Sequence, residues 1–359
     1  MKKAQLDPAG QLDQKQVKLA ERYVKHQKLK DANELYALFF FKEEIGQGAF
    51  GRVIEVTEKN TLKVWAMKIV TKAKLEKWSE LQQEIKILKF VSHPHIIKLE
   101  AIFETSMKLY MLFELCSGTL QKYYEDKFPL SDKTVKIVVY DIVDAVAYLH
   151  KNNIVHRDIK MQNILLTINE KESDEVFVKL SDFGLSLVRT GRSYQDMIHQ
   201  FCGTLYYMAP EICEEKGYSE LCDIWSLGVI TYMMLLGKKP FSGKTESEVI
   251  NNIVNSEPTY SNESIVISED AVHLLKGMLR KTPTDRFNAA LILEHPWLSK
   301  KKQKSRLSEY NVLDMMKMWK DDIKIESSSR QTDWEQELSM TINLPSQTQL
   351  KSINRNSPG

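Results

Sequence analysis

The sequence contains few cysteines, almost no net charge and no long apolar run. Only four of its 359 residues are cysteine, and no two form a Cys-x-x-Cys pair. This usage is typical of reduced thiols in a cytoplasmic or nuclear protein rather than of a disulfide framework. The 50 lysines and arginines nearly balance the 48 aspartates and glutamates, which leaves a net charge of +2. That balance argues against a protein that binds nucleic acid by neutralising phosphates.

Signals for membrane attachment are missing as well. The longest apolar stretch, residues 224–236, is shorter than the roughly 20 residues that span a bilayer, and it contains Ser226 and Thr231. No apolar segment follows Met1, and Lys2 stands where N-myristoylation requires glycine. We therefore expect a cytoplasmic protein, with the nucleus as the alternative, and neither a membrane nor a nucleic-acid partner.

The pattern of apolar residues divides the chain into regions. Residues 1–35 are rich in Lys, Gln and Glu, and we expect a polar helix or a disordered arm there. Residues 36–115 alternate short apolar runs with glycines and include one stretch of helical spacing at 75–91. Residues 116–298 are mostly helical in period, with Ser131 as the N-cap of a long amphipathic helix. The pattern predicts an α+β domain with a small sheet-rich part and a larger helical part.

The C-terminal extension, residues 299–359, carries a basic cluster at 300–306 and an amphipathic segment at about 308–322. Four apolar residues of that segment recur at helical spacing: Val312, Met315, Met316 and Trp319. Such a helix either docks on the larger part of the domain or binds a regulatory partner such as calmodulin. Aspartates within the segment dilute the positive charge of a calmodulin target, so docking is the favoured interpretation. The remaining Ser/Gln/Asn-rich sequence is expected to be disordered.

A glycine-rich segment between two expected strands is the first feature with chemical meaning. Glycines let backbone N–H groups approach phosphate oxygens. Dinucleotide-binding folds share this spacing but continue into a helix, whereas here an expected strand continues through Val56. The segment predicts a loop that covers phosphates, formed by Ile45, Gly46, Gln47, Gly48, Ala49, Phe50, Gly51 and Val53.

Two charged residues follow this loop at informative positions. Lys68 lies 17 residues after Gly51 in an expected strand, from which its ammonium group reaches the α- and β-phosphates of a nucleotide. Glu84, in the expected helix, is placed to pair with Lys68. Glu80 is its nearest rival, but Glu84 precedes the apolar Leu88 by four residues, which favours an inward-facing carboxylate.

Three further motifs follow in order: His-Arg-Asp at 156–158, Asp-Phe-Gly at 182–184 and Ala-Pro-Glu at 209–211. Asp158 is suited to orient or deprotonate an attacking hydroxyl, and Lys160 to neutralise charge on a transferred phosphoryl group. Asn163 and Asp182 offer oxygen ligands to a hard cation. Four ordered motifs at compatible spacings leave a chance match below about 1%.

These motifs resemble those of the eukaryotic protein kinase family. The resemblance implies a two-lobed fold over residues 36–298, with a small lobe at 36–115 and a large lobe at 116–298. It implies ATP and Mg²⁺, with Mn²⁺ as an alternative, and protein substrates. It also implies an adenine pocket of Val53, Ala66 and Leu165 and a gatekeeper and hinge of Phe113, Glu114, Leu115 and Cys116. Asp223 resembles the residue that ties down the catalytic loop, and Arg286 the partner of Glu211; plain core packing is the alternative for both.

Lys160 and the Cys-Gly-Thr sequence at 202–204 resemble the serine/threonine class. The segments at 93–96, 113–116 and 222–229 resemble the calcium/calmodulin-dependent kinase group. The resemblance implies that Thr204 hydrogen-bonds Asp158 and Lys160. Three acids that hold substrate arginines in basophilic relatives are missing, because the sequence has Gln162 and Met233 at two of the positions and no Glu in residues 117–120. We predict weak selection for arginine at the third position upstream of the phosphoacceptor. Leu205, where many relatives have proline, alters the downstream pocket.

The activation segment is also unusual. Arg157 is suited to dock a phosphate, but the position where relatives often supply one is Gln200. Thr190, Ser193 and Tyr194 lie nearer the tip of the segment and do not match the usual site. We therefore hypothesise that activity does not depend on phosphorylation of this segment.

The sequence as a whole predicts an ATP- and Mg²⁺-dependent protein serine/threonine kinase. The alternative is a pseudokinase or scaffold that binds partners without turnover. That class usually has at least one degraded catalytic position, whereas Lys68, Asp158, Asn163 and Asp182 are all present. A small-molecule phosphotransferase lacks support, because the segment from Cys-Gly-Thr to Ala-Pro-Glu resembles a peptide-binding feature.

Overall fold

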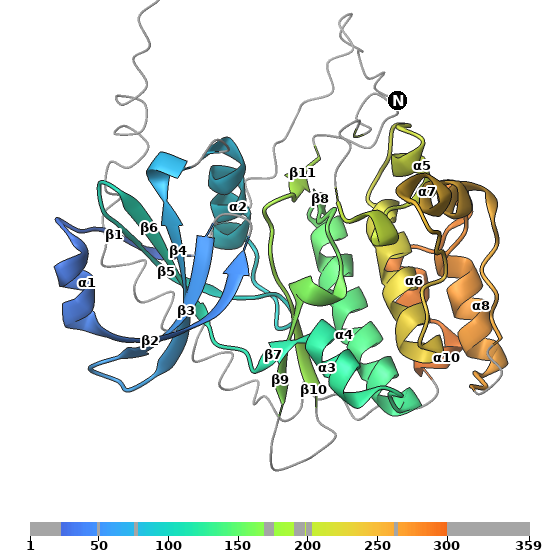
Figure 1. The fold of residues 1–359 in the computed structure, drawn as a ribbon, viewed down its shortest axis with the longest axis horizontal. Helices are drawn as coiled ribbons and strands as arrows, with labels where there is room; N and C mark the ends of the chain where they lie inside the picture. The colour runs from blue at the N-terminus through green and yellow to red at the C-terminus, as the bar shows by residue number, and fades with distance from the viewer. Residues whose placement is uncertain are drawn as a thin grey trace, which may run out of the picture. The chain divides into compact units, whose positions relative to one another are not determined.

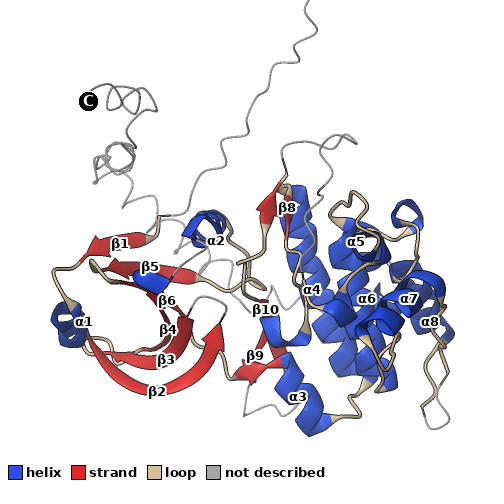
Figure 2. Ribbon diagram, turned by 45° about the horizontal axis from the view of Figure 1, so that its top comes forward, coloured by secondary structure: helices blue, strands red, loops and turns tan. Residues whose placement is uncertain are grey.

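The computed structural model describes residues 23–48, 51–74, 78–168, 176–189, 198, 203–261 and 265–299. The predicted C-terminal helix, the basic cluster at 300–306, Ala49, Phe50 and the candidate phosphosites of the activation segment lie outside these residues. Within the described part, no helix combines the length and apolarity needed to cross a bilayer. Figures 1 and 2 show a sheet-rich lobe beside a helical lobe. The predicted α+β class and two-lobed architecture are confirmed.

The small lobe is built on one six-stranded sheet in the order β1-β5-β6-β4-β3-β2. Helix α2 lies against this sheet (Figure 1) and buries Leu81, Ile87 and Leu88. Because α2 also buries Glu84, a carboxylate faces the sheet among these apolar residues. The elements of this lobe are β1 (Lys25–Lys28), α1 (Ala32–Leu38), β2 (Phe39–Gly48), β3 (Gly51–Glu58), β4 (Val64–Thr71), η1 (Lys72–Lys74), α2 (Trp78–Phe90), β5 (Leu99–Glu104) and β6 (Lys108–Glu114).

The predicted polar arm at residues 1–35 needs correction where the structure describes it. Strand β1 pairs in parallel with β5, and α1 follows it directly, so both belong to the small lobe. The strand itself is polar and shows no apolar alternation, which is why its sequence did not reveal it. Its anchors are the flanking Val24 and Leu29, each 7% exposed, and a hydrogen bond between His26 Nε2 and Glu104 Oε2 of 2.9 Å.

The large lobe is mainly helical, and two helices form its centre. Helix α4 is capped by Ser131, whose hydroxyl accepts a hydrogen bond from the N–H of Thr134 at 3.1 Å, as the sequence predicts. Helix α6 is buried nearly all round, which explains the apolar run at 224–236. The helices are α3 (Leu120–Lys127), α4 (Asp132–Lys151), α5 (Pro210–Cys213), α6 (Leu221–Leu236), α7 (Glu246–Asn255), α8 (Glu269–Met278), α9 (Ala289–Leu293) and α10 (Pro296–Ser299).

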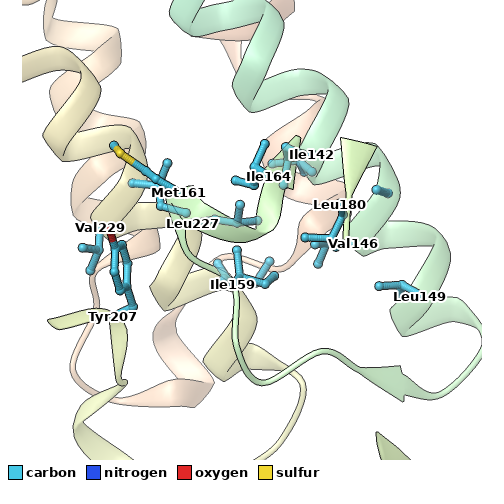
Figure 3. Packing of buried hydrophobic residues seen from close by; sticks show 14 of the residues in the cluster. Ile142, Val146, Leu149, Ile159, Met161, Ile164, Leu180, Tyr207, Leu227 and Val229 are labelled. Atoms are coloured by element: carbon cyan, nitrogen blue, oxygen red, sulfur yellow. The ribbon is translucent and has the colours of Figure 1, made fainter. Parts of the chain in front are cut away.

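Short strands and single turns of 3₁₀-helix complete the large lobe. They are β7 (Gly118–Thr119), β8 (Ile154–Val155), η2 (Met161–Asn163), β9 (Ile164–Ile168), β10 (Val176–Leu180), β11 (Leu187–Val188), η4 (Leu205–Tyr207) and η5 (Pro283–Asp285). Figure 3 shows Ile159, Met161 and Ile164 packed among residues of α4 and α6. Apolar packing therefore holds the segment that follows Asp158.

Candidate active site

The backbone of the segment around His156 and Asp158 is hydrogen-bonded to the side chain of Asp223 in α6. Asp223 Oδ2 accepts hydrogen bonds from the backbone N–H of His156 and from His150 Nε2, each at 2.9 Å, and Oδ1 accepts one from the N–H of Arg157 at 2.9 Å. Burial acts to raise the pKa of Asp223, but the hydrogen bonds that it accepts from the His150 ring and from the backbone N–H of His156 outweigh this effect, and the pKa is lowered. Asp223 thus stays ionised and ties the loop backbone to the core, as predicted.

His156 is completely buried between the loop and the Asp-Phe-Gly motif. Its Nε2 lies 3.1 Å from the carbonyl oxygen of Ser181, and its ring meets Phe183 edge-on at 4.9 Å. Its Nδ1 faces the N–H of Asp158 at 3.4 Å. Burial lowers the pKa of His156. A neutral ring with its proton on Nε2 satisfies both contacts, so His156 joins the two motifs without a charge.

The carboxylate of Asp158 is held by three side chains. Its Oδ2 accepts hydrogen bonds from Lys160 Nζ at 2.7 Å and from Asn163 Nδ2 at 3.0 Å. Its Oδ1 accepts one from the hydroxyl of Thr204 at 3.1 Å, and Lys160 also donates to that hydroxyl at 3.1 Å. Each carboxylate oxygen offers about two acceptor positions. Oδ2 is therefore filled, whereas Oδ1 accepts one hydrogen bond from the described part of the chain and keeps one position for an incoming hydroxyl.

Asn163 and Asp182 are the two residues predicted to hold a metal. Asp182 has a φ of +63°, in the left-handed region that few residues adopt. The amide nitrogen of Asn163 donates to the carbonyl and the carboxylate of Asp158, at 2.9 and 3.0 Å, so its amide oxygen is left for another partner. The Asp182 carboxylate and the Asn163 amide oxygen are both hard oxygen donors, and the chain brings them near each other because Ser181, next to Asp182, donates two hydrogen bonds to the Asn163 carbonyl oxygen.

This donor set fits a magnesium ion carried by a nucleotide. The described residues include no group of three or more His, Cys, Asp and Glu side chains that could hold a metal by themselves. Mg²⁺ does not need such a group, because it is commonly bound through one or two protein oxygens together with waters and substrate phosphates. Asn163 and Asp182 would hold the ion, whose positive charge would neutralise phosphate charge.

Lys68 of β4 and Glu84 of α2 form the predicted ion pair. Lys68 Nζ lies 2.8 Å from Glu84 Oε1, and the side chains are 9% and 2% exposed. Burial raises the pKa of Glu84, although Lys68 opposes this effect. The second oxygen, Oε2, is buried and has no hydrogen-bond partner among the residues that the structure describes. The carboxylate thus depends on Lys68, and Glu84 rather than Glu80 is the partner.

The glycine loop connects two strands whose register places the nucleotide-facing residues. Gly48 pairs with Gly51 across β2 and β3, and Val53 of β3 faces Lys68 of β4. A Cβ atom at Gly51 would overlap the carbonyl oxygen of Ile69, so only glycine allows β3 to approach β4 there. Gly46, in contrast, has open space around its Cα.

The residues predicted to enclose an adenine come from both lobes. Ala66 pairs with Phe113 across β4 and β6, and Leu165 lies in β9. Val53, Ala66 and Leu165 are only partly buried, whereas Phe113 is 9% exposed. Partly buried apolar side chains at the junction of the lobes suit a flat aromatic ligand.

The hinge is fixed through Glu114. Its Oε1 accepts a hydrogen bond from the N–H of Lys98 at 2.7 Å and lies 3.1 Å from Lys179 Nζ. Burial raises the pKa of the neighbouring Cys116 to about 11, so this thiol is a weak nucleophile at neutral pH.

The end of the activation segment is locked by a buried ion pair. Both guanidinium nitrogens of Arg286 reach the carboxylate of Glu211, at 2.7 and 2.9 Å, and Arg286 is 4% exposed. This is the predicted partnership. The hydroxyl of Ser226 adds a 2.7 Å hydrogen bond to the carbonyl oxygen of Tyr207, which links η4 to α6.

Arg157 lies between the loop and the start of the activation segment. Its Nε donates to the carbonyl oxygen of Leu185 at 2.5 Å, and Nη1 lies 3.5 Å from the hydroxyl of Tyr218. Tyr218 in turn forms two backbone hydrogen bonds with Ile198, each of 2.9 Å. Protein groups therefore engage the arginine for which the sequence suggested a phosphate partner.

Sequence reasoning missed His150, Ser226 and Tyr218. Each contacts a functional segment that is distant from it in the sequence, and none of them belongs to a recognisable motif. His150 lies at the end of α4, where a basic residue is ordinary in sequence. Only the helix period, which places it toward α6, could have pointed to Asp223.

Comparison with known proteins agrees with this geometry. The family model described as "Protein kinase domain" matches residues 39–298, which is well over half of the chain. The chain therefore belongs to the protein kinase family.

Three relatives are named as a serine/threonine-protein kinase, a myosin light chain kinase and a calcium-dependent protein kinase. Serine/threonine-protein kinase 33 of Bos taurus is 38% identical over 307 residues, covering 84% of this chain and 63% of that protein. Myosin light chain kinase A of Dictyostelium discoideum is 38% identical over 289 residues, covering 79% of this chain and 94% of that protein. Calcium-dependent protein kinase 27 of Arabidopsis thaliana is 32% identical, covering 87% and 64%. The chain thus spans less than two thirds of the first of these relatives.

Proposed function

We propose that this protein is a kinase that transfers the γ-phosphoryl group of ATP to serine and threonine hydroxyls of proteins. The observation that carries this proposal is the environment of Asp158. Lys160, Asn163 and Thr204 hold its carboxylate so that one acceptor position of Oδ1 is left open. A substrate hydroxyl that donates to this position is oriented for attack and has a proton acceptor in contact.

The lysines supply the charges that phosphoryl transfer requires. Lys68, held by Glu84 on the small lobe, is placed for the α- and β-phosphates. Lys160 contacts both Asp158 and Thr204, so its ammonium group lies beside the position of the transferred group. A bound Mg²⁺ on Asn163 and Asp182 would neutralise further phosphate charge. Positioning and charge stabilisation account for most of the catalysis in this type of reaction.

Two kinds of observation support the serine/threonine class and the calcium/calmodulin-dependent group. They are the names of the relatives and the presence of Lys160. Relatives named serine/threonine-protein kinase and myosin light chain kinase share 36–38% identity with the chain. Similarity to calcium-dependent kinases supports a place in the calcium/calmodulin-dependent group and a regulatory partner on the C-terminal extension. A location in the cytoplasm, or alternatively the nucleus, accords with the cysteine usage.

Independence from activation-segment phosphorylation is part of the same proposal. A phosphate orders a loop by accepting new charge-assisted hydrogen bonds from an arginine. Here Leu185 and Tyr218 engage Arg157. Mapping of phosphates at Thr190, Ser193 and Tyr194, followed by phosphatase treatment and assay, tests this point. Activity lost together with any of the three phosphates would overturn it.

The test of the proposed activity uses radiolabelled ATP, Mg²⁺ and two general substrates, casein and myelin basic protein. We expect incorporation by the wild type and a 10²–10⁴-fold smaller rate for Asp158→Asn, because the amide no longer accepts the hydroxyl proton. Phosphoamino acid analysis should show phosphoserine and phosphothreonine. Equal incorporation by both proteins would exclude Asp158 as the base, and none by either would favour the pseudokinase alternative.

A further inference from the structure

The surface beside Asp158 carries a row of polar side chains that the proposed chemistry does not use. Gln162 lies in η2, immediately before Asn163, and η2 packs against α3. From α3, Gln121 and Glu125 lie one helical turn apart on the same face. Gln162 and Glu125 are exposed, and Gln121 is half-buried. We refer to Gln162, Gln121 and Glu125 as the rim row.

Hydrogen bonds give the rim row a direction. Gln162 Nε2 donates to Gln121 Oε1 at 3.4 Å, and Gln121 Nε2 donates to Glu125 Oε1 at 2.5 Å. The row therefore starts next to the residue that holds Asp158 and leads away from it along α3. Its inner members are neutral amides, and its outer end is a carboxylate.

Glu125 differs in one respect from its neighbour Asp126. Asp126 pairs with Lys122 on the same helix at 3.3 Å. Within the described residues, no lysine or arginine forms an ion pair with Glu125, whose hydrogen bond comes from a neutral amide. The charge at the outer end of the rim row is thus available to a cation on another molecule.

We propose that Glu125 selects a basic side chain in the protein substrate, at a position farther from the phosphoacceptor than the residue that faces Gln162. One turn of helix advances about 5.4 Å, and an extended peptide advances about 3.3 Å per residue. The selected residue therefore lies about two positions beyond the one that faces Gln121. This inference rests on the proposed function, because it requires a peptide bound with its hydroxyl at Asp158.

The size of the selection follows from exposure. An ion pair between exposed side chains stabilises a complex weakly, which corresponds to a change in kcat/KM of about two- to fivefold. Glu125 thus changes the relative kcat/KM of substrates and is not required for phosphorylation. The two glutamines provide no charge, which accords with weak selection for arginine nearer the phosphoacceptor.

The experiment measures kcat/KM on a peptide series in which each position upstream of one serine is arginine, glutamine or glutamate. We expect the wild type to favour arginine over glutamate about fivefold at the selected position, Glu125→Gln to lose this preference and Glu125→Lys to reverse it. Asp126→Asn, the matched control on the same helix, should keep the wild-type profile. Thermal unfolding shows whether each variant is folded.

Two results would overturn the proposal. One is an unchanged profile in both Glu125 variants, and the other is an equal change in Asp126→Asn, which would indicate a general effect of charge on α3. Failure of the proposed function looks different. In that case no peptide is phosphorylated by the wild type above the level of Asp158→Asn.

Discussion

The catalytic centre and the rim row lie side by side but are held in different ways. Around Asp158, three side chains fix one carboxylate, and Asp223 fixes the backbone beneath it. The rim row lies at the surface, with only Gln121 half-buried, and two hydrogen bonds join its members. Buried polar groups that are satisfied by one another tolerate little change, whereas exposed ones can be exchanged at small cost. The comparison indicates that the buried residues around Asp158 fix the chemistry, whereas the residues of the rim row influence which substrate is chosen.

The largest effect on stability should come from the buried ion pair beneath the centre. Arg286→Met leaves the carboxylate of Glu211 buried without its partner, and we expect the free energy of unfolding to fall by about 3–5 kcal/mol. The matched control is Lys216→Met, which breaks a surface pair with Glu214 and should cost less than about 1 kcal/mol. Denaturant unfolding measures the free energy of unfolding of both variants. Equal losses would show that the buried pair of Arg286 and Glu211 contributes no more to stability than the surface pair.

A comparable loss, in rate rather than stability, is expected at the small lobe. Lys68→Met removes the cation held by Glu84, and we expect kcat/KM to fall roughly 10²–10³-fold, as for the loss of one stabilising donor. Glu84→Gln keeps the cation of Lys68 but no longer holds it in one position, so we expect a smaller fall in kcat/KM for this variant. Steady-state kinetics with varied ATP distinguish the two variants. A Glu84→Gln enzyme as impaired as Lys68→Met would contradict the assignment of roles.

A smaller effect is expected from acid. Burial lowers the pKa of His95 to about 4, from an ordinary value of 6.5, although its hydrogen bond to Val178 opposes the shift. The unfolded chain therefore binds the proton more readily, and stability is lost as the pH falls below 6.5 toward 4. Between pH 7 and 5 this amounts to about 2 kcal/mol. Unfolding at both pH values should show a flatter dependence in His95→Asn, and an unchanged dependence would exclude His95 as the cause.

Much of the catalytic centre was predictable because its residues occur in short motifs whose chemistry requires them. Lys68, Asp158, Asn163 and Asp182 were identified by type and spacing, and the ion pair with Glu84 followed from the helix period. The strand β1 was not, because its polar residues pair at a sheet edge and carry no apolar alternation. Nor was the rim row, since its members are distant in sequence and meet only when η2 packs against α3.

One measurement tests most directly whether the residues around Asp158 set the rate while the rim row sets substrate preference. It compares kcat and kcat/KM on two peptides that differ only by arginine or glutamine at the third position upstream of the serine, with Asp158→Asn and Gln162→Glu beside the wild type. We predict that Asp158→Asn loses kcat by the same factor on both peptides. Gln162→Glu should keep kcat and raise the relative kcat/KM of the arginine peptide by up to about fivefold. A Gln162→Glu enzyme with reduced kcat and an unchanged ratio would contradict the account.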